Sequence, residues 1–102
     1  MSKKKKIYKS YEELLHSELK DPEVAVAYLN EALAEEDQTV FLIALKDVLD
    51  AWGEDMATLA KEAHLNRQNL YRMLSQKGNP RWNSLTSLFG AMGLQIQLTM
   101  RK

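Results

Sequence analysis

The 102-residue sequence predicts a mainly α-helical fold, a compact bundle of five to six helices followed by one β-strand. Three observations predict it. Apolar residues recur at helical spacing through most of the chain. Capping residues precede most of these segments. Only the last segment changes to a two-residue repeat, which is typical of a strand with one buried face.

Two short helices are expected near the N-terminus. Ser10 has the position of an N-cap for a helix from Tyr11 to about Leu19. Asp21 supplies an N-cap and Pro22 a first-turn proline for a second helix, because proline has no amide hydrogen to lose there. The apolar stripe of the second helix consists of Ala25, Tyr28, Leu29, Ala32 and Leu33.

A longer helix is expected next, from Gln38 to about Trp52. Asp37 has the position of its N-cap, and Gly53 follows its last turn, where glycine readily adopts the conformation that ends a helix. The buried face of this helix is expected to contain Phe41, Leu42, Leu45, Val48, Leu49 and Trp52.

The segment from Thr58 to Leu74 predicts two helices joined by a tight turn. Asp55 precedes the first as an N-cap, and Ala60 is small where a second helix would cross, so the two axes could approach closely. Asn66 has the position of N-cap of the second helix. The apolar stripes are Met56, Leu59, Ala60 and Ala63 on the first helix and Leu70, Met73 and Leu74 on the second.

The opposite face of that second helix carries side chains suited to base recognition. It presents Gln68, Tyr71, Arg72 and Ser75, with Arg67 beside them near the helix start. Arginine can bind guanine O6 and N7 through two hydrogen bonds, and Gln or Asn can bind adenine N6 and N7 in the same way. The alternative is an ordinary solvated helix face. The preceding small-residue helix, the short turn and the distribution of charge favour DNA recognition.

The charge is strongly segregated although fourteen basic and fourteen acidic residues give a formal net charge of zero. Every acid lies at or before Glu62, and residues 63–102 hold six basic residues and no acid. Residues 10–62 hold three basic and fourteen acidic residues, and residues 1–9 hold five lysines. A basic block around a candidate recognition helix is the electrostatic pattern expected for phosphate binding. The lysine-rich residues 1–9 are interpreted as a flexible solvated tail, with a weak phosphate-binding arm as the alternative.

The C-terminal part is expected to form one more helix and then a strand. Asn83 would cap a helix from Ser84 to Met92, which Gly93 ends. A lone strand must pair with a partner edge, and pairing with the same strand of a second copy would give a two-fold homodimer. Two recognition helices could then enter successive major grooves about 34 Å apart. The strand could instead fold back or pair with a different partner. Its buried face consists of Leu94, Ile96, Leu98 and Met100.

Several function classes are disfavoured. The absence of cysteine removes disulfides and thiolate sites and fits a reducing cytoplasm. The longest apolar run, Val40 to Leu45, is too short to span a membrane, and residues 1–10 lack the apolar region of a secretory signal. His16 and His64 are isolated, no pair of acids stands at metal-ligand spacing beside either, and no glycine-rich phosphate loop is present. We therefore expect no catalytic, metal or cofactor site and no enzymatic activity.

Several longer motifs carry a resemblance to a known family. Residues 41–98 resemble the Xre/Cro-type helix-turn-helix family, the group of phage repressors with a lambda-repressor-like fold, and more closely the antidote (antitoxin) proteins of bacterial addiction modules. The resemblance implies a cytoplasmic dimer that binds operator DNA sequence-specifically, represses its own operon and neutralises a toxin. The carrying motifs cover about 80 residues in the family's order: DPEVAVAYLNEAL, VFLIALKDVLDAWG, LAKEAHLNRQNLYRML, KGNPRW and LFGAMGLQIQL.

The resemblance also implies roles for individual residues. One departure concerns the turn, where His64 stands in place of the family's usual glycine; histidine tolerates positive φ better than most residues. A direct role of His64 at the DNA is an open alternative. The base-reading candidates are Arg67, Gln68 and Arg72, with Asn69 and Tyr71 near the groove wall. The phosphate-binding candidates are Met56, Thr58, Lys77 and Arg81.

The expected organisation has three parts. Residues 1–9 form the tail, residues 10–36 are acidic helices that would hold a basic toxin, and residues 37–102 form the DNA-binding domain with its dimerisation strand. Alternatively, the acidic helices could have only a structural role, packing against the core without binding a toxin. A stand-alone prophage-type regulator without a toxin has the same DNA chemistry, and the sequence does not separate it from an antitoxin.

Overall fold

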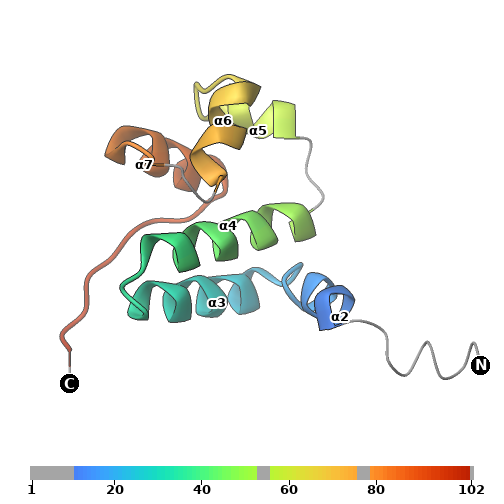
Figure 1. Cartoon of the computed structure of the whole chain (residues 1–102), viewed down its shortest axis with the longest axis vertical. Coiled ribbons are helices and arrows are strands. Elements are labelled where there is room, and N and C mark those ends of the chain that lie inside the picture. The colour runs from blue at the N-terminus through green and yellow to red at the C-terminus, as the bar shows by residue number, and fades with distance from the viewer. Residues whose placement is uncertain (1–10, 53–55, 76–78, 102) are drawn as a thin grey trace, which may run out of the picture. The chain divides into compact units, whose positions relative to one another are not determined.

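The computed structural model describes residues 11–52, 56–75 and 79–101 (Figure 1). The described residues are mainly helical, as the sequence predicts. They form two units, residues 1–54 with α2–α4 (unit 1) and residues 55–102 with α5–α7 (unit 2). None of the helices in the described ranges is long and apolar enough to cross a membrane. The helices are α2 (Tyr11–Glu18), α3 (Pro22–Ala34), α4 (Gln38–Trp52), α5 (Met56–Glu62), α6 (Arg67–Leu74) and α7 (Trp82–Ala91).

In unit 1, α3 and α4 lie side by side and α2 packs against α4 (Figure 1). Two predicted N-caps are confirmed, because Asp21 Oδ1 accepts from the Glu23 amide and Asp37 Oδ1 from the Thr39 amide, both at 2.9 Å. The sequence predicts Leu33 in the apolar stripe of α3, and this prediction is wrong, because Leu33 is 53% exposed. The buried residues of unit 1 are Leu19, Ala25, Leu29, Ala32, Phe41, Leu42, Ala44, Leu45, Val48, Leu49 and Ala51.

In unit 2, α5 packs against both α6 and α7. The stripes predicted for α5 and α6 are buried, apart from Met56, whose side chain lies outside the described part. Ala60 is 2% exposed, as expected for a small residue between packed helices. The buried residues of unit 2 are Leu59, Ala60, Ala63, Leu70, Met73, Leu74, Leu88, Phe89 and Met92.

Two helices of unit 2 end in the same way, with one residue in the left-handed region. This residue is His64 after α5, with φ +59°, and Gly93 after α7, with φ +79°. In each case the amide of the following residue donates to a carbonyl oxygen in the last helical turn, at 2.7 Å after α5 and 2.8 Å after α7. The positive φ expected at His64 is therefore confirmed. Glu36 after α3 also has a positive φ, +57°, which the sequence interpretation missed.

The start of α7 differs from the prediction. The helix begins at Trp82, with Arg81 in extended conformation as its N-cap, so Asn83 lies in the first turn and caps nothing. Arg81 makes no side-chain capping hydrogen bond. The helix thus begins two residues earlier than the position of Asn83 predicts.

The expected C-terminal strand is absent from the described chain. Residues 94–101 have neither helical nor strand structure. Leu98 and Met100 are 92% and 91% exposed, so the alternating apolar residues are not covered. A strand is defined by its hydrogen-bonded partner, and the single chain offers these residues no such edge. The expected caps Ser10 and Asp55, the helix end at Gly53 and the lysine-rich tail fall outside the described residues.

Candidate nucleic-acid interface

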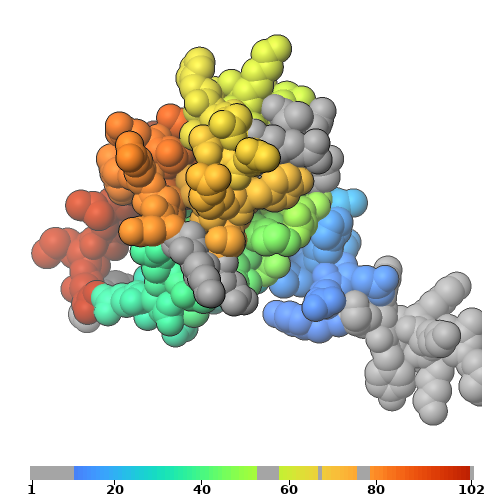
Figure 2. All heavy atoms as spheres, turned by 45° about the horizontal axis from the view of Figure 1, so that its top comes forward, coloured from blue at the N-terminus to red at the C-terminus, as the bar shows by residue number. Residues whose placement is uncertain are grey.

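The rotation of α6 about its axis is fixed by its buried residues. Asn66 caps the helix, its Oδ1 accepting from the Asn69 amide at 2.7 Å. Leu70 and Leu74 lie on the buried side, so the opposite side faces solvent. The side chains of α6, gold in Figure 2, lie at the surface of unit 2. The exposed residues of this face are Gln68, Asn69, Tyr71 and Arg72.

The other candidates occupy different parts of unit 2. Arg67 is the first residue of α6 and Met56 the first of α5, but the side chains of both lie outside the described part. Thr58 is exposed in the first turn of α5, and Arg81 is exposed at the start of α7. Lys77 falls outside the described residues. The structure thus places Gln68, Asn69, Tyr71 and Arg72 on one helix and Arg81 on a separate segment.

A surface hollow brings Arg72 of α6 and Arg81 together. No acidic residue lines it, so two guanidinium groups set its electrostatic character. The sequence interpretation did not single out Asn79 or Ser84, which also line it; the polar residues flanking Pro80 were the available signal. The full lining is Leu65, Asn69, Arg72, Met73, Asn79, Pro80, Arg81 and Ser84.

The same hollow includes the start of α7. Arg81 gives α7 no side-chain cap, and Ser84 lies in its first turn. Amides in the first turn of a helix have no partner within the helix, and they attract anions such as phosphate. Arginine side chains beside such amides are typical of a phosphate-binding surface.

The four expected dimerisation residues are largely solvent-exposed. Leu94 is half-buried next to the end of α7, whereas Ile96, Leu98 and Met100 are exposed. Leu98 and Met100 are 92% and 91% exposed, so the far end of the segment has no cover in the single chain.

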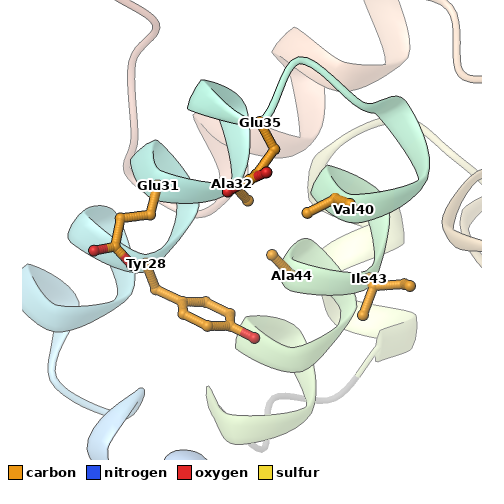
Figure 3. A pocket seen from close by; sticks show the side chains of 7 residues that line it. All are labelled: Tyr28, Glu31, Ala32, Glu35, Val40, Ile43 and Ala44. Atoms are coloured by element: carbon orange, nitrogen blue, oxygen red, sulfur yellow. The ribbon is translucent and has the colours of Figure 1, made fainter.

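Unit 1 carries two further hollows. The first lies between α3 and α4, and Figure 3 shows the ring of Tyr28 extending from α3 toward α4. The second also involves α2. The first is lined by Tyr28, Glu31, Ala32, Glu35, Val40, Ile43 and Ala44. The second is lined by Tyr11, Glu12, Leu15, His16, Leu19, Tyr28, Ile43, Asp47 and Asp50.

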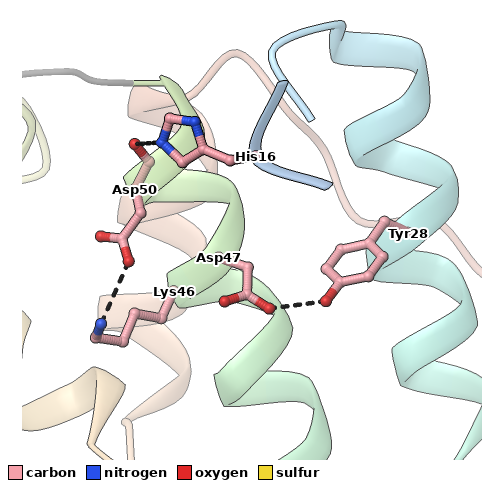
Figure 4. A network of polar contacts seen from close by, with 5 residues as sticks. All are labelled: His16, Tyr28, Lys46, Asp47 and Asp50. Atoms are coloured by element: carbon pink, nitrogen blue, oxygen red, sulfur yellow. Dashed lines mark hydrogen bonds and ion pairs between the residues drawn. The ribbon is translucent and has the colours of Figure 1, made fainter. Parts of the chain in front are cut away.

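Polar contacts link the three helices around these hollows (Figure 4). The Tyr28 hydroxyl donates to Asp47 Oδ2 at 2.7 Å. Burial, and then this hydrogen bond to a carboxylate, raise the pKa of Tyr28 well above its ordinary value. A His16 ring nitrogen lies 3.0 Å from the Asp50 carbonyl oxygen, and Lys46 Nζ lies 3.3 Å from Asp50 Oδ2. The sequence interpretation placed Tyr28 in an apolar stripe and missed its hydroxyl contact, which periodicity does not reveal.

Comparison with known proteins identifies the family to which the chain belongs. A family model described as "Probable addiction module antidote protein" matches residues 9–100, a range that spans both units and every described candidate residue. An "Uncharacterized protein" from Haemophilus influenzae is 37% identical over 71 residues, which cover 70% of this chain and 71% of the relative. No solved structure matches.

Proposed function

Because the chain belongs to the "Probable addiction module antidote protein" family, we propose that it is an antitoxin that binds operator DNA, represses its own operon and neutralises a cognate toxin. The protein acts by binding rather than by catalysis. The exposed face of α6 carries the DNA-binding part of this proposal. Its alternative is a stand-alone prophage-type regulator without a toxin partner.

The α6 face supports base reading in the major groove. Arg72 is exposed, and its guanidinium donors match the acceptors O6 and N7 of guanine, whereas the side-chain amides of Gln68 and Asn69 match adenine N6 and N7. Arg67 at the helix start and Tyr71 complete the proposed set. An eight-residue helix with its apolar side buried is long enough to present these residues to several consecutive bases.

The hollow next to α6 supports phosphate binding. Arg81 and the uncapped start of α7 supply a cation and amide donors on one surface. Thr58 of α5 and, from the sequence, Met56 and Lys77 extend the proposed backbone contacts. Contacts of this kind fix the register of the protein on DNA and leave sequence selection to α6.

A homodimer is part of the proposal. Residues 94–100 keep a two-residue apolar repeat, and residues 95–100 are exposed, so two copies could pair these segments about a two-fold axis. Pairing would convert an uncovered segment into a strand and place two α6 helices on one operator.

A toxin partner is proposed for the acidic helices at residues 10–36. Unit 1 holds seven basic and twelve acidic residues, a net charge of −5 that suits a positively charged partner. Recovery of the product of a neighbouring gene together with the tagged full chain would support the antitoxin. The stand-alone regulator would be recovered without a protein partner.

DNA binding is tested by fluorescence anisotropy with a duplex from the region upstream of the chain's own gene. Arg72→Ala is expected to relax selection at one base pair by about 1–3 kcal/mol. Arg81→Ala is expected to weaken binding to all sequences and to reduce the salt dependence by about one phosphate contact. Lys46→Ala, which removes a cation from unit 1, is the matched control and should bind like the unmodified chain. Unchanged DNA binding by both Arg72→Ala and Arg81→Ala would mean that α6 is not part of the DNA interface.

A further inference from the structure

The two hollows of unit 1 adjoin, because Tyr28 and Ile43 line both. We call this surface the acidic groove; it comprises the lining residues of the two hollows given above. Its floor is apolar, with Ala32, Ala44 and Leu15 along it. Ile43 is 42% exposed and Val40 37% exposed, so two adjacent turns of α4 present branched apolar side chains to solvent. Apolar side chains grouped inside a groove, rather than scattered singly, are typical of a binding surface.

The rim of the acidic groove has one sign of charge. Five carboxylates line the two hollows, and no lysine or arginine does. Of these carboxylates, Asp50 forms an ion pair with Lys46, and both side chains of that pair are about half exposed. Asp47 accepts the hydroxyl of Tyr28. The five are Glu12, Glu31, Glu35, Asp47 and Asp50.

Helix stability does not explain two of these acids. Glu31 lies in the last turn of α3 and Glu35 is its C-cap, where the partial charge of the helix is negative. The last turn of α3 contains no basic residue to offset them. Carboxylates at this end lower the stability of the helix, whereas a cationic partner would be attracted both by them and by the helix end.

We propose that the acidic groove binds a basic amphipathic segment of the cognate toxin. Apolar side chains of that segment pack on Val40 and Ile43, and its lysine or arginine side chains pair with Glu31, Glu35 and Asp47. This inference rests on the antitoxin role proposed above. It moves part of the toxin-binding surface from residues 10–36 onto α4, where the sequence interpretation did not place it.

The test uses the full chain and, as probe, the purified product of the gene next to its own that encodes a small basic protein, titrated by calorimetry. Ile43→Lys places a cation among the apolar lining residues of the groove and is expected to weaken binding about ten-fold or more. Glu31→Lys combined with Glu35→Lys is expected to weaken it and to reduce its dependence on salt. Leu33→Lys is the matched control: Leu33 is an exposed apolar residue of α3 that lines neither hollow, and binding should stay within about two-fold.

The outcomes separate the groove from the antitoxin role. Selective loss with Ile43→Lys, with an unchanged far-UV circular dichroism spectrum and urea midpoint as evidence of folding, supports the groove. Equal binding by Ile43→Lys, Leu33→Lys and the unmodified chain overturns the groove and leaves the antitoxin role standing. No binding by the unmodified chain overturns both. A change of oligomeric state in Ile43→Lys, without a change in toxin affinity, also overturns it, because the groove would then be an interface between copies.

Discussion

Replacing His64 by glycine is expected to stabilise unit 2 without altering its interface. His64 has φ +59°, and a left-handed residue with a Cβ costs about 1–2 kcal/mol. Glycine removes that cost but gains freedom in the unfolded chain, which offsets about 0.4–1 kcal/mol. The net gain is therefore about 0–1.6 kcal/mol, with a central value of about 0.8 kcal/mol. His64→Ala is the matched control, since alanine keeps the Cβ and should not be more stable than histidine.

Urea unfolding followed by far-UV circular dichroism measures this difference. With an m-value of about 1.5 kcal/mol per molar, the central value corresponds to a rise of the midpoint by about 0.5 M for His64→Gly. Operator affinity should stay unchanged, because the turn keeps its geometry and α6 keeps its capping residue. A lower midpoint for His64→Gly than for His64→Ala would refute the reasoning. The histidine side chain, and not the backbone conformation, would then control this turn.

Four further outcomes follow from the described contacts. Asn66→Ala removes the cap of α6 and should lower the free energy of unfolding by about 1 kcal/mol in urea; Asn66→Asp should restore it. Tyr28→Phe removes the bond to Asp47 and should cost about 1–2 kcal/mol at neutral pH. Because the folded-state pKa of Tyr28 lies above the ordinary value of 10.0, its stabilising effect is complete below that pH and is lost as pH rises above it. The stability of the unmodified chain should then approach that of Tyr28→Phe above pH 10. Glu35→Lys should raise stability by about 0.3–1 kcal/mol in a thermal melt while weakening toxin binding; equal stability would mean that the end of α3 is insensitive to charge. Leu98→Glu should leave the fold intact, because Leu98 is exposed, but give a monomer by light scattering; an unchanged dimer would remove this segment from the interface.

The helices were predictable because their signals are local. Asp21, Asp37 and Asn66 each cap a helix within a few residues of their own position, and apolar spacing identifies the buried side of α6 without knowledge of the rest of the chain. The left-handed residue at His64 was also predictable, because the resemblance to helix-turn-helix repressors implies a glycine at this position. These features depend on backbone geometry and on residues three or four positions apart.

Features that depend on distant residues were not predictable. The hollow shared by Arg72 and Arg81, and the groove at Ile43, join residues from separate helices. The contact of Tyr28 with Asp47 spans nineteen positions, and nothing in the periodicity of α3 indicates it. The two-residue repeat at 94–100 is a local signal. A strand, however, forms only when a second segment pairs with it through backbone hydrogen bonds, so the repeat alone does not produce a strand.

The division of charge between the units makes the two proposed binding activities separable. Unit 1 has a net charge of −5, and unit 2, with seven basic and two acidic residues, has +5. Unit 1 would repel DNA and unit 2 would attract it. A basic protein would be attracted by unit 1 and repelled by unit 2. Arg72 and Ile43 lie in different units, so their substitutions share no described partner and should act additively on each activity. A double variant whose DNA affinity falls beyond the sum of the two single effects would require coupling between the units, because neither contact surface includes residues of the other.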